Sequence, residues 1–281
     1  MQVGLTLSGI NPKYRIAAAQ AAEEAGFDSV WLPEHLVFPL EMGGNPRTGD
    51  GHPPIPPETA TYDVFVSLAM VAAATSRIRV GTNVYNIGLR HPFIVARSVA
   101  SLDVLSNGRL DFGIGASWLA GEWEAMELDF DTRGRRIDET IEVCRRLWSE
   151  DAVEHHGEFF DFPPVAFNPK PTQQPQPPLI VGGDARAAQR RAATVGDSWF
   201  PLNHPLEAIP ATLRAINKQR TDAGRSGTTT LTLSSGTNLR PNLIRYRTIG
   251  TERLITRPYT SSRTAIDEIR RFGDEVLSRF R

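Results

Sequence analysis

The stretch "RIRVGTNVYNIGLRHPFIVARSVASLDVLSNGRLDFGIGASW", residues 77–118, contains the pattern that decides the fold. It begins with an apolar run at 77–84 and ends with a second one at 109–115, and both runs are typical of strands. Between them, Val95 and Val99 belong to a set of apolar residues at helical spacing. A strand, a helix and another strand in this order predict a parallel sheet covered by helices.

The same alternation extends over most of the chain. Eight apolar runs predict strands, and most are followed by a helix, which fits a closed (β/α)8 barrel; a doubly wound open sheet is the alternative. The unit at 236–250 is the weakest, because it contains a proline and has no clean helical face. We expect residues 1–281 to form one domain. The predicted strands are 2–7, 27–32, 77–84, 109–115, 179–183, 197–202, 229–235 and 252–257.

Two segments interrupt the alternation. Residues 36–61, inserted after the second predicted strand, hold many Gly and Pro residues and predict one long loop. A loop of this length inside a compact domain is usually functional, and we expect it to act as a lid over an active site. Residues 151–178 are irregular and predict a small hairpin at 152–162, followed by an extended proline-rich stretch.

The composition is that of an ordinary globular protein. The 281 residues include 31 basic and 32 acidic side chains, a net charge of −1, which gives no reason to expect nucleic acid or an anionic membrane as a partner. No apolar run is long enough to span a membrane, and the N-terminus predicts a strand rather than a signal peptide. The single cysteine, Cys144, excludes an intrachain disulfide and a cysteine-based zinc cluster. We therefore expect a cytoplasmic enzyme.

In a barrel of this kind, the active site lies at the carboxyl ends of the strands, where the loops after the strands meet. We therefore expect the residues that follow the first six predicted strands to converge on one mouth. The groups at these positions are Ser8-Gly9, Glu34-His35, Asn83-Val84-Tyr85-Asn86, Gly115-Ala116-Ser117-Trp118, Gly182-Gly183-Asp184 and Phe200-Pro201.

Three motifs have competing interpretations. At Gly182-Gly183 a strand leads into a helix, whose free N–H groups and dipole favour an anion such as phosphate, although Asp184 can instead cap that helix. The string "GIGASW" is not a dinucleotide fingerprint, because Trp118 stands at a position that requires Gly or Ala. His155 and His156 are adjacent on a predicted strand and so point to opposite faces, and we expect no metal site.

Six strings occur in an order and spacing that resemble one family, over roughly residues 1–225. They are "AEEAGFDSVWLPEH", "AAATSRIRVGTNV", "LRHPFIVARSVASLDVLSNGRLDFGIGASW", "RGRRIDETIEVCRRLW", "GEFFDF" and "PPLIVGGDARAAQRRAATVGDSWFP". The chain resembles the bacterial luciferase-like flavin and deazaflavin oxidoreductases. The resemblance is closest to the branch that uses the deazaflavin coenzyme F420.

The resemblance implies a (β/α)8 barrel in which the cofactor ring lies across the carboxyl-terminal mouth. It assigns to Asn83-Val84 a bulge, often with a non-prolyl cis peptide, that supports the ring from behind. Glu34-His35 matches the acid–histidine pair against the ring; Glu34 stands where the family usually has Asp, and either touches the ring or orients His35. Gly182-Gly183-Asp184 matches the segment that holds the cofactor's phosphate tail. We also expect cofactor contacts from Gly115-Ala116-Ser117.

The implied reaction is hydride transfer between the deazaflavin and an unidentified small-molecule organic substrate. His35 is the candidate catalytic residue that handles the accompanying proton. Phe38, Tyr85, Trp118 and Trp199 are the expected walls of the substrate pocket. Trp118 also stands where the family's sugar-phosphate dehydrogenases have a glutamate acid/base, which argues against that activity.

Two alternative functions remain open. The same fold can use reduced FMN and oxygen as a monooxygenase, and the ring sites of the two groups are alike. A non-catalytic barrel that binds a ligand is the second alternative, favoured by the departures at Glu34 and Asp184. The resemblance also implies a homodimer, with helices near 63–75 and 92–106 as its interface.

Overall fold

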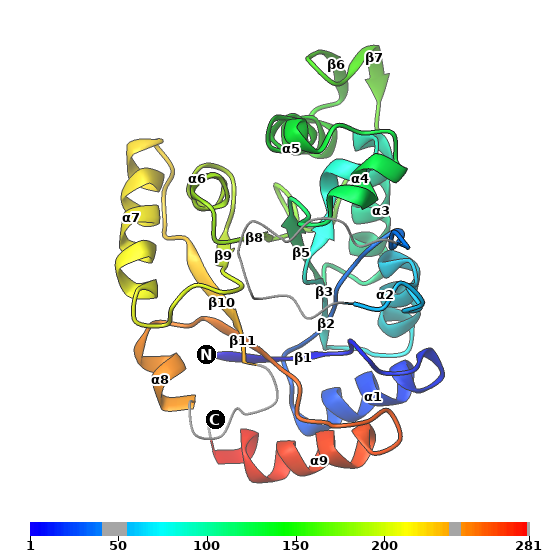
Figure 1. Ribbon diagram of the computed structural model, residues 1–281, viewed down its shortest axis with the longest axis vertical. Helices are drawn as coiled ribbons and strands as arrows, with labels where there is room; N and C mark the ends of the chain where they lie inside the picture. The colour runs from blue at the N-terminus through cyan, green and yellow to red at the C-terminus, as the bar shows by residue number, and fades with distance from the viewer. Residues whose placement is uncertain (41–54, 236–242, 280–281) are drawn as a thin grey trace.

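The computed structural model describes residues 1–40, 55–235 and 243–279, and its centre is a closed barrel of eight parallel strands (Figure 1). Around the barrel, these strands are β1 (Gln2–Thr6), β2 (Ser29–Leu32), β3 (Arg79–Thr82), β5 (Leu110–Gly115), β8 (Leu179–Gly182), β9 (Ser198–Phe200), β10 (Thr230–Ser234) and β11 (Arg253–Thr256). The pairing of β1 with β11 and of β3 with β5 closes the sheet. The barrel prediction is therefore confirmed and the open sheet is wrong. Each barrel strand lies inside one of the predicted runs.

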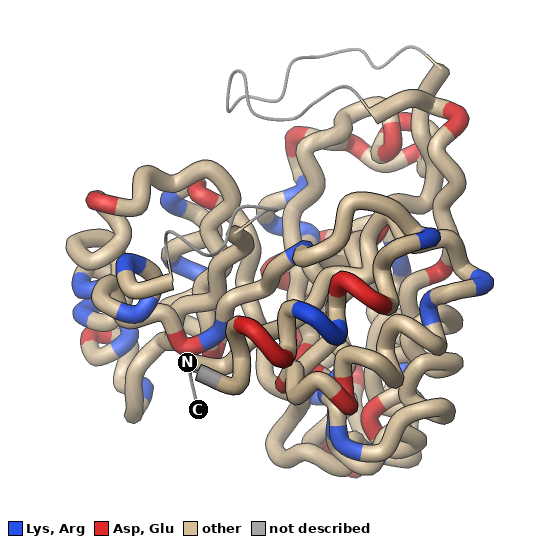
Figure 2. Tube along the Cα trace, turned by 90° about the horizontal axis from the view of Figure 1, so that it is seen from below, with Lys and Arg blue, Asp and Glu red and all other residues tan. Residues whose placement is uncertain are grey.

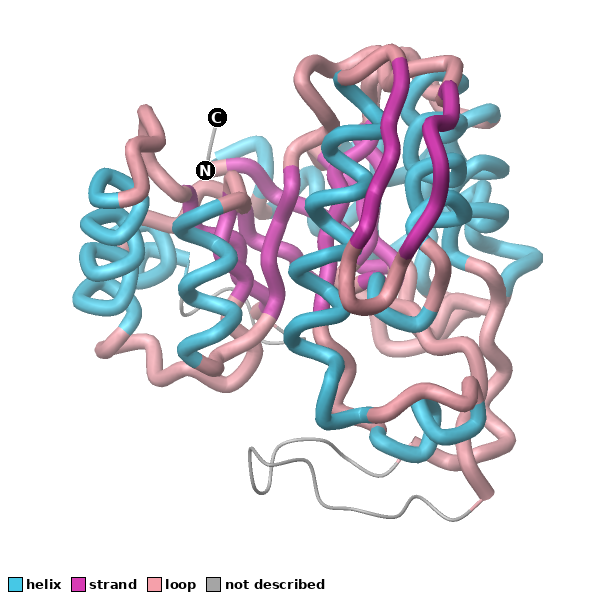
Figure 3. The backbone as a smooth tube through the Cα atoms, turned by 90° about the horizontal axis from the view of Figure 1, so that it is seen from above, coloured by secondary structure: helices cyan, strands magenta, loops and turns pink. Residues whose placement is uncertain are grey.

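Helices surround the barrel (Figure 3), and the first shows how the sequence sets their ends. The Asn11 side chain accepts a hydrogen bond from the Lys13 N–H, Pro12 opens the first turn, and Gly26 ends the helix in the left-handed region with φ 88°. The predicted stop at Gly26 is confirmed. The helices are α1 (Pro12–Ala25), α2 (Val64–Ala73), α3 (Pro92–Leu105), α4 (Ala120–Ala125), α5 (Arg133–Ser149), α6 (Arg186–Thr194), α7 (Ile209–Asp222), α8 (Leu243–Thr248) and α9 (Ala265–Glu275), with short 3₁₀ turns at Ile87–Leu89, Phe130–Thr132 and Leu277–Arg279.

The third barrel strand is interrupted at its carboxyl end. In β3, Val80 lies opposite Leu110 of β5. In the short continuation β4 (Tyr85–Asn86), Tyr85 lies opposite Ile114 of the same strand. Tyr85 is therefore five residues after Val80, whereas Ile114 is only four residues after Leu110. The one extra residue on the β3 side is that of a β-bulge. The Asn83-Val84 peptide within this bulge is cis, so both predictions for this position are confirmed.

One large side chain, Trp31 of β2, fills part of the barrel interior. A β-carbon added at Gly4 of β1 would lie 2.6 Å from the Trp31 Nε1, and Gly81 of β3 faces the same ring. Glycine on both neighbouring strands therefore makes room for the indole in a close-packed interior. The other buried members of this interior cluster are Ile180, Phe200 and Ile255.

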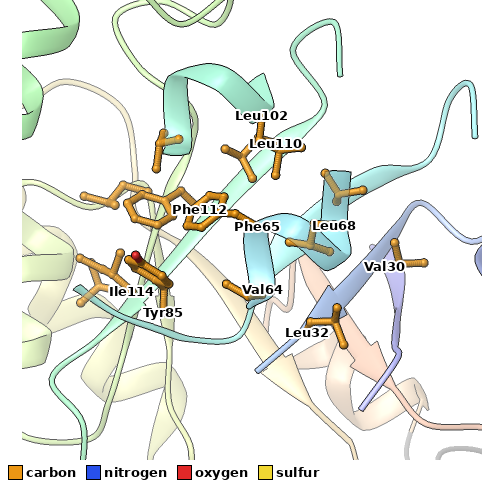
Figure 4. Close-up of a cluster of buried hydrophobic side chains, with 14 of the residues drawn as sticks. Val30, Leu32, Val64, Phe65, Leu68, Tyr85, Leu102, Leu110, Phe112 and Ile114 are labelled. Atoms are coloured by element: carbon orange, nitrogen blue, oxygen red, sulfur yellow. The ribbon is translucent and has the colours of Figure 1, made fainter. Parts of the chain in front are cut away.

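The larger apolar core lies between the barrel and the helices, because successive strand residues point to opposite faces. Val30 and Leu32 flank Trp31 in β2 and point outward, toward side chains of α2 and α3 (Figure 4). The same cluster includes the other residues labelled in this view, which are Val64, Phe65, Leu68, Tyr85, Leu102, Leu110, Phe112 and Ile114.

The irregular segment before β8 forms an antiparallel hairpin of β6 (Ala152–His156) and β7 (Asp161–Ala166), which projects from the barrel (Figure 1). The predicted hairpin is confirmed. His155 is buried and His156 is exposed, so the two rings do point to opposite faces. Residues 41–54 of the predicted lid, and 236–242 of the weak seventh unit, lie outside the described residues.

Charged residues of both signs are intermixed over the surface seen in Figure 2. Within the described ranges, no helix is both long and apolar enough to cross a membrane. The same ranges contain no group of three or more His, Cys, Asp or Glu side chains that could hold a metal ion.

Candidate active site

A cavity of about 1220 Å³ opens at the carboxyl ends of the barrel strands. Its size is above the usual range for a single drug-sized ligand, so it has room for a cofactor together with a substrate. The predicted cofactor contacts all line this cavity: Glu34, His35, Asn83, Val84, Gly115, Ala116, Ser117, Gly182, Gly183 and Asp184. The predicted pocket residues Phe38 and Trp118 line it as well.

His35 stands in the cavity wall between two aromatic rings. Its ring centroid is 4.9 Å from that of Phe38 and 5.9 Å from that of Trp118. Its Nδ1 lies 3.0 Å from Oε2 of Glu122. The His35 side chain retains 15% of its exposure, whereas the Glu122 side chain has none. The imidazole is therefore held from behind by a buried carboxyl group and reaches the cavity with its other edge.

Glu122 is the functional candidate that the sequence reasoning missed. It belongs to the short helix α4, and its Oε1 accepts a hydrogen bond from the Leu36 N–H at 2.6 Å. Ser117 Oγ lies 3.3 Å from its other oxygen. An ionised carboxylate only accepts hydrogen bonds, so the proton on His35 belongs on Nδ1, which leaves Nε2 for a molecule in the cavity.

The Glu34 carboxylate binds residues other than His35. Its Oε2 accepts the Asn86 N–H at 2.9 Å, and its Oε1 lies 2.6 Å from Nη2 of Arg90. The side-chain amide of Asn86 also donates to the Glu34 carbonyl, at 3.1 Å. The interpretation that Glu34 orients His35 is wrong, because its carboxylate is committed to Arg90 and Asn86. Glu34 instead ties the end of β2 to β4.

Tyr85 and Trp199, both expected in the pocket wall, are core residues instead. Tyr85 packs against Phe65 and Phe112, and Trp199 is fully buried in the core outside the barrel. The reason is strand alternation: Phe200, next to Trp199, takes the inward position. The Trp199 Nε1 donates to the Gly183 carbonyl at 2.9 Å, so Trp199 supports the strand end from outside.

The glycines at the ends of β5 and β8 make room for Val84. A β-carbon added at Gly115 would lie 2.5 Å from Val84 Cγ2, and one at Gly182 would lie 2.8 Å from Val84 Cγ1. The valine that follows the cis peptide thus sits in a notch between two glycines, and it forms part of the cavity floor. Close packing therefore explains why both positions lack a side chain.

Asp184 does not cap α6, contrary to one of the two expectations for it. Its carboxylate accepts the N–H groups of Leu202 and Asn203, both at 3.0 Å, and fixes the loop after β9. The N-cap residue of α6 is Ala185, which has no side-chain hydrogen bond to the helix. The first turn of α6 therefore presents N–H groups without a side-chain cap next to Gly183, which suits an anion.

These features fit a ring cofactor with an anionic tail. Asn83 lines the cavity, and its buried Oδ1 has no hydrogen-bond partner among the described residues, so it is an acceptor that a ligand N–H would satisfy. The first turn of α6 offers the anion site, and Val84 offers an apolar floor between them. The chemistry of this donor and acceptor set matches the group that the sequence resemblance implies.

Comparison with known proteins agrees with the geometry. The sequence profile described as luciferase-like monooxygenase matches residues 2–240. An uncharacterized protein of Mycobacterium tuberculosis is 35% identical over 214 residues, which cover 76% of this chain and 73% of that protein. An FMNH2-dependent dimethylsulfone monooxygenase of Pseudomonas putida is 31% identical over 232 residues, 79% of this chain and 59% of that protein. An F420-dependent secondary alcohol dehydrogenase has the same fold, with a TM-score of 0.78, 17% identity, and coverage of 99% and 98% of the two chains.

Proposed function

Because the chain belongs to the luciferase-like monooxygenase family, we propose that it is an oxidoreductase that transfers a hydride between coenzyme F420 and a small organic substrate. The choice of F420 rests on the resemblance of the six strings, which is closest to the deazaflavin branch. The F420-dependent alcohol dehydrogenase shows that a barrel of this fold can use F420. When bound, the deazaflavin would supply or accept the hydride.

The observation that carries the proposal is the buried contact between His35 and Glu122. Oxidation or reduction at a carbon that bears oxygen requires a proton to leave or join that oxygen as the hydride moves. With Nδ1–H held by Glu122, His35 takes or gives this proton at Nε2. The Glu122 carboxylate stabilises the imidazolium while the proton resides on the ring.

The walls around His35 keep the proton transfer away from bulk water. Phe38 and Trp118 pack on two sides of the imidazole, and Ser117 lies beside the Glu122 carboxylate. A hydrogen bond is stronger in such an apolar setting than in water. Asn83 and the first turn of α6 would hold the cofactor at its ring and at its phosphate, respectively.

A second candidate is a monooxygenase that uses reduced FMN and oxygen. It is favoured by the 31% identity to the FMNH2-dependent dimethylsulfone monooxygenase. The residues described above serve that chemistry as well, since a flavin ring has a similar shape and also carries an N–H group and a phosphate. In that case His35 would move a proton to or from a different oxygen.

Titration of the purified protein with F420 and with FMN separates the candidates. We expect saturable F420 binding that weakens in His35→Ala. Tight FMN binding without F420 binding would contradict the proposal, and oxygen uptake with reduced FMN would then establish the second candidate. Binding of neither cofactor would favour a ligand-binding barrel without catalysis.

We also propose a homodimer formed through α2 and α3. Val66 and Met70 are four residues apart on α2 and are 63% and 54% exposed, and Ile94 at the start of α3 is 58% exposed. Large apolar side chains grouped on neighbouring helices are typical of an interface. Light scattering should give twice the chain mass for the wild type and the single mass for Val66→Glu combined with Met70→Glu. A monomeric wild type would contradict the proposal.

A further inference from the structure

Arg15, on α1, is a charged residue of the cavity wall that none of the described carboxylates neutralises. Its Nε donates to the Ile10 carbonyl at 3.2 Å, and its Nη1 donates to Ser67 Oγ at 3.3 Å. Its guanidinium also lies over the ring of Tyr62, 5.0 Å from the centroid. These partners are all neutral, and Arg15 forms no ion pair with any of the described residues.

Arg257, directly after β11, has even fewer partners. The residue is partly buried, and its Nε is shielded from solvent with no hydrogen-bond partner in residues 1–40, 55–235 and 243–279. Within the described part of the chain, its guanidinium contacts the Tyr259 ring, 5.2 Å from the centroid, but has no hydrogen bond or ion pair. Its Nη2 adjoins the β1 loop, because a β-carbon added at Gly9 would lie 3.2 Å from it. Gly9 in turn lines the cavity.

Tyr259 holds the loop that follows β1, but it supplies no negative charge to Arg15 or Arg257. Its hydroxyl contacts the carbonyls of Thr6 and Ser8, at 2.7 and 2.6 Å. Burial raises the pKa of Tyr259 far above its ordinary value, so the phenol stays neutral. Burial also lowers the pKa of Arg15, which reflects the cost of holding a cation there without an anion.

The acidic side chains of the cavity wall are engaged elsewhere. Among the described residues, these are Glu34, Asp131 and Asp184. Glu34 pairs with Arg90, and Asp184 accepts two backbone N–H groups. Asp131 lies 3.9 Å from Arg133 and is largely exposed. Arg15 in the cavity wall and Arg257 next to Gly9 of that wall therefore carry positive charge that no described carboxylate neutralises.

We infer that Arg15 and Arg257 form a subsite for an oxyanion of the substrate, such as a carboxylate, sulfonate or phosphate group. A guanidinium binds such groups through several directed N–H donors, and each charge-assisted hydrogen bond is stronger than a neutral one. The inference rests on the proposed function, because it takes the bound molecule to be the substrate of that reaction.

The position of the subsite separates it from the cofactor's phosphate. In the order β1-β2-β3-β5-β8-β9-β10-β11, strand β8 lies four strands from β1 in either direction. The first turn of α6, which follows β8, is therefore across the mouth from the arginines. His35 follows β2, the neighbour of β1, so an anion bound by the arginines leaves the rest of the substrate beside the imidazole.

Calorimetric titration with benzoate, and with benzamide as its neutral counterpart, tests the inference. We expect saturable binding of benzoate and much weaker binding of benzamide. Arg15→Gln and Arg257→Gln should each weaken benzoate binding about tenfold, the effect of losing one charged hydrogen bond. Arg257→Lys, which keeps the charge, should lose less. Arg135→Gln is the matched control, because Arg135 is exposed and pairs with Glu158 on the surface.

The outcomes divide as follows. Equal binding of the two probes, absence of benzoate binding, or unchanged binding in both glutamine variants would overturn the inference. Displacement of benzoate by the cofactor, with loss of cofactor binding in the same variants, would assign the arginines to the cofactor's tail and would also overturn it. Thermal unfolding shows whether each variant folds. If Arg257→Gln does not fold, the benzoate binding of Arg257→Lys and Arg15→Gln tests the inference instead. The proposed function fails in a different experiment: it fails if the wild-type protein binds no cofactor, whatever its binding of benzoate.

Discussion

Charged side chains at two neighbouring edges of the cavity differ in whether they have partners of opposite charge. At the end of β2, His35 contacts Glu122, and Glu34 pairs with Arg90 and Asn86. At β1 and β11, Arg15 and Arg257 have no carboxylate partner among the described residues. A buried charge with a partner has a fixed position, whereas one without a partner is costly until a ligand arrives. The first edge is therefore suited to positioning reactive atoms, and the second to binding.

The largest expected effect comes from breaking a buried pair at the first edge. Glu34→Ala leaves Arg90 charged and only 11% exposed, and we expect a loss of about 3–5 kcal/mol in the free energy of unfolding. Denaturant unfolding measures it. Glu158→Ala is the control, because it breaks an exposed pair with Arg135 and should cost far less. Equal losses in the two variants would show that the β2 edge is not specially dependent on its pairing.

The next effect concerns the rate of the proposed reaction. Glu122→Gln keeps the shape of the side chain but removes the charge that stabilises protonated His35, and we expect turnover to fall about 100-fold. The pH dependence of turnover should change, whereas KM should change little. Glu124→Gln, at an exposed position of the same helix, is the control. A lower melting temperature with an unchanged pH profile would reduce Glu122 to a structural residue.

Much of the cavity lining could be predicted from the sequence, because strand ends are a local property. The alternation of apolar runs placed His35, Asn83-Val84 and Gly182-Gly183 at carboxyl ends of strands, and the barrel brings such ends together. The bulge at Asn83-Val84 followed from the resemblance and has no signature in composition.

The missed and misplaced residues depend on tertiary packing. Glu122 and Glu124 are two residues apart in the same short helix, and only burial shows that Glu122 is the one that meets His35. Whether Trp199 or Phe200 points into the barrel depends on the register of β9 with its neighbours. Asp184 is a plausible helix cap in sequence, but its partners come from the loop after β9.

A smaller effect tests the packing of Val84 in the cavity floor. Gly115→Ala brings a methyl group against Val84, and we expect a loss of about 1–3 kcal/mol in the free energy of unfolding from overpacking. Val84→Ala in the same chain removes the opposing methyl groups, so the double variant should recover part of that loss. If the losses of the two single variants simply add in the double variant, Val84 does not pack against Gly115, because two groups that clash must show coupling.

The smallest effect lies outside both edges, at Glu23. Burial alone would raise the pKa of this carboxyl, but hydrogen bonds from the N–H groups of Ser76, Arg77 and Ile78 outweigh it and lower the pKa. A lowered folded-state pKa stabilises the protein above the unfolded value, and the contribution is lost as the pH falls through the folded value. Unfolding of wild type and Glu23→Gln should therefore differ at pH 7, by roughly 0.5 kcal/mol because the site is only partly buried, and the difference should disappear once the pH is below the lowered pKa. A difference that persists in acid would contradict this assignment.

The most direct measurement of the central claim is the tautomer of His35, read from ¹⁵N chemical shifts at a pH where the ring is neutral. His35→Gln assigns the signals. If the buried Glu122 carboxylate holds the imidazole, the proton resides on Nδ1 and Nε2 carries the lone pair; Glu122→Gln removes this preference. A ring protonated on Nε2 in the wild type would contradict the account, because the nitrogen facing the cavity would then be unable to take a proton from a substrate.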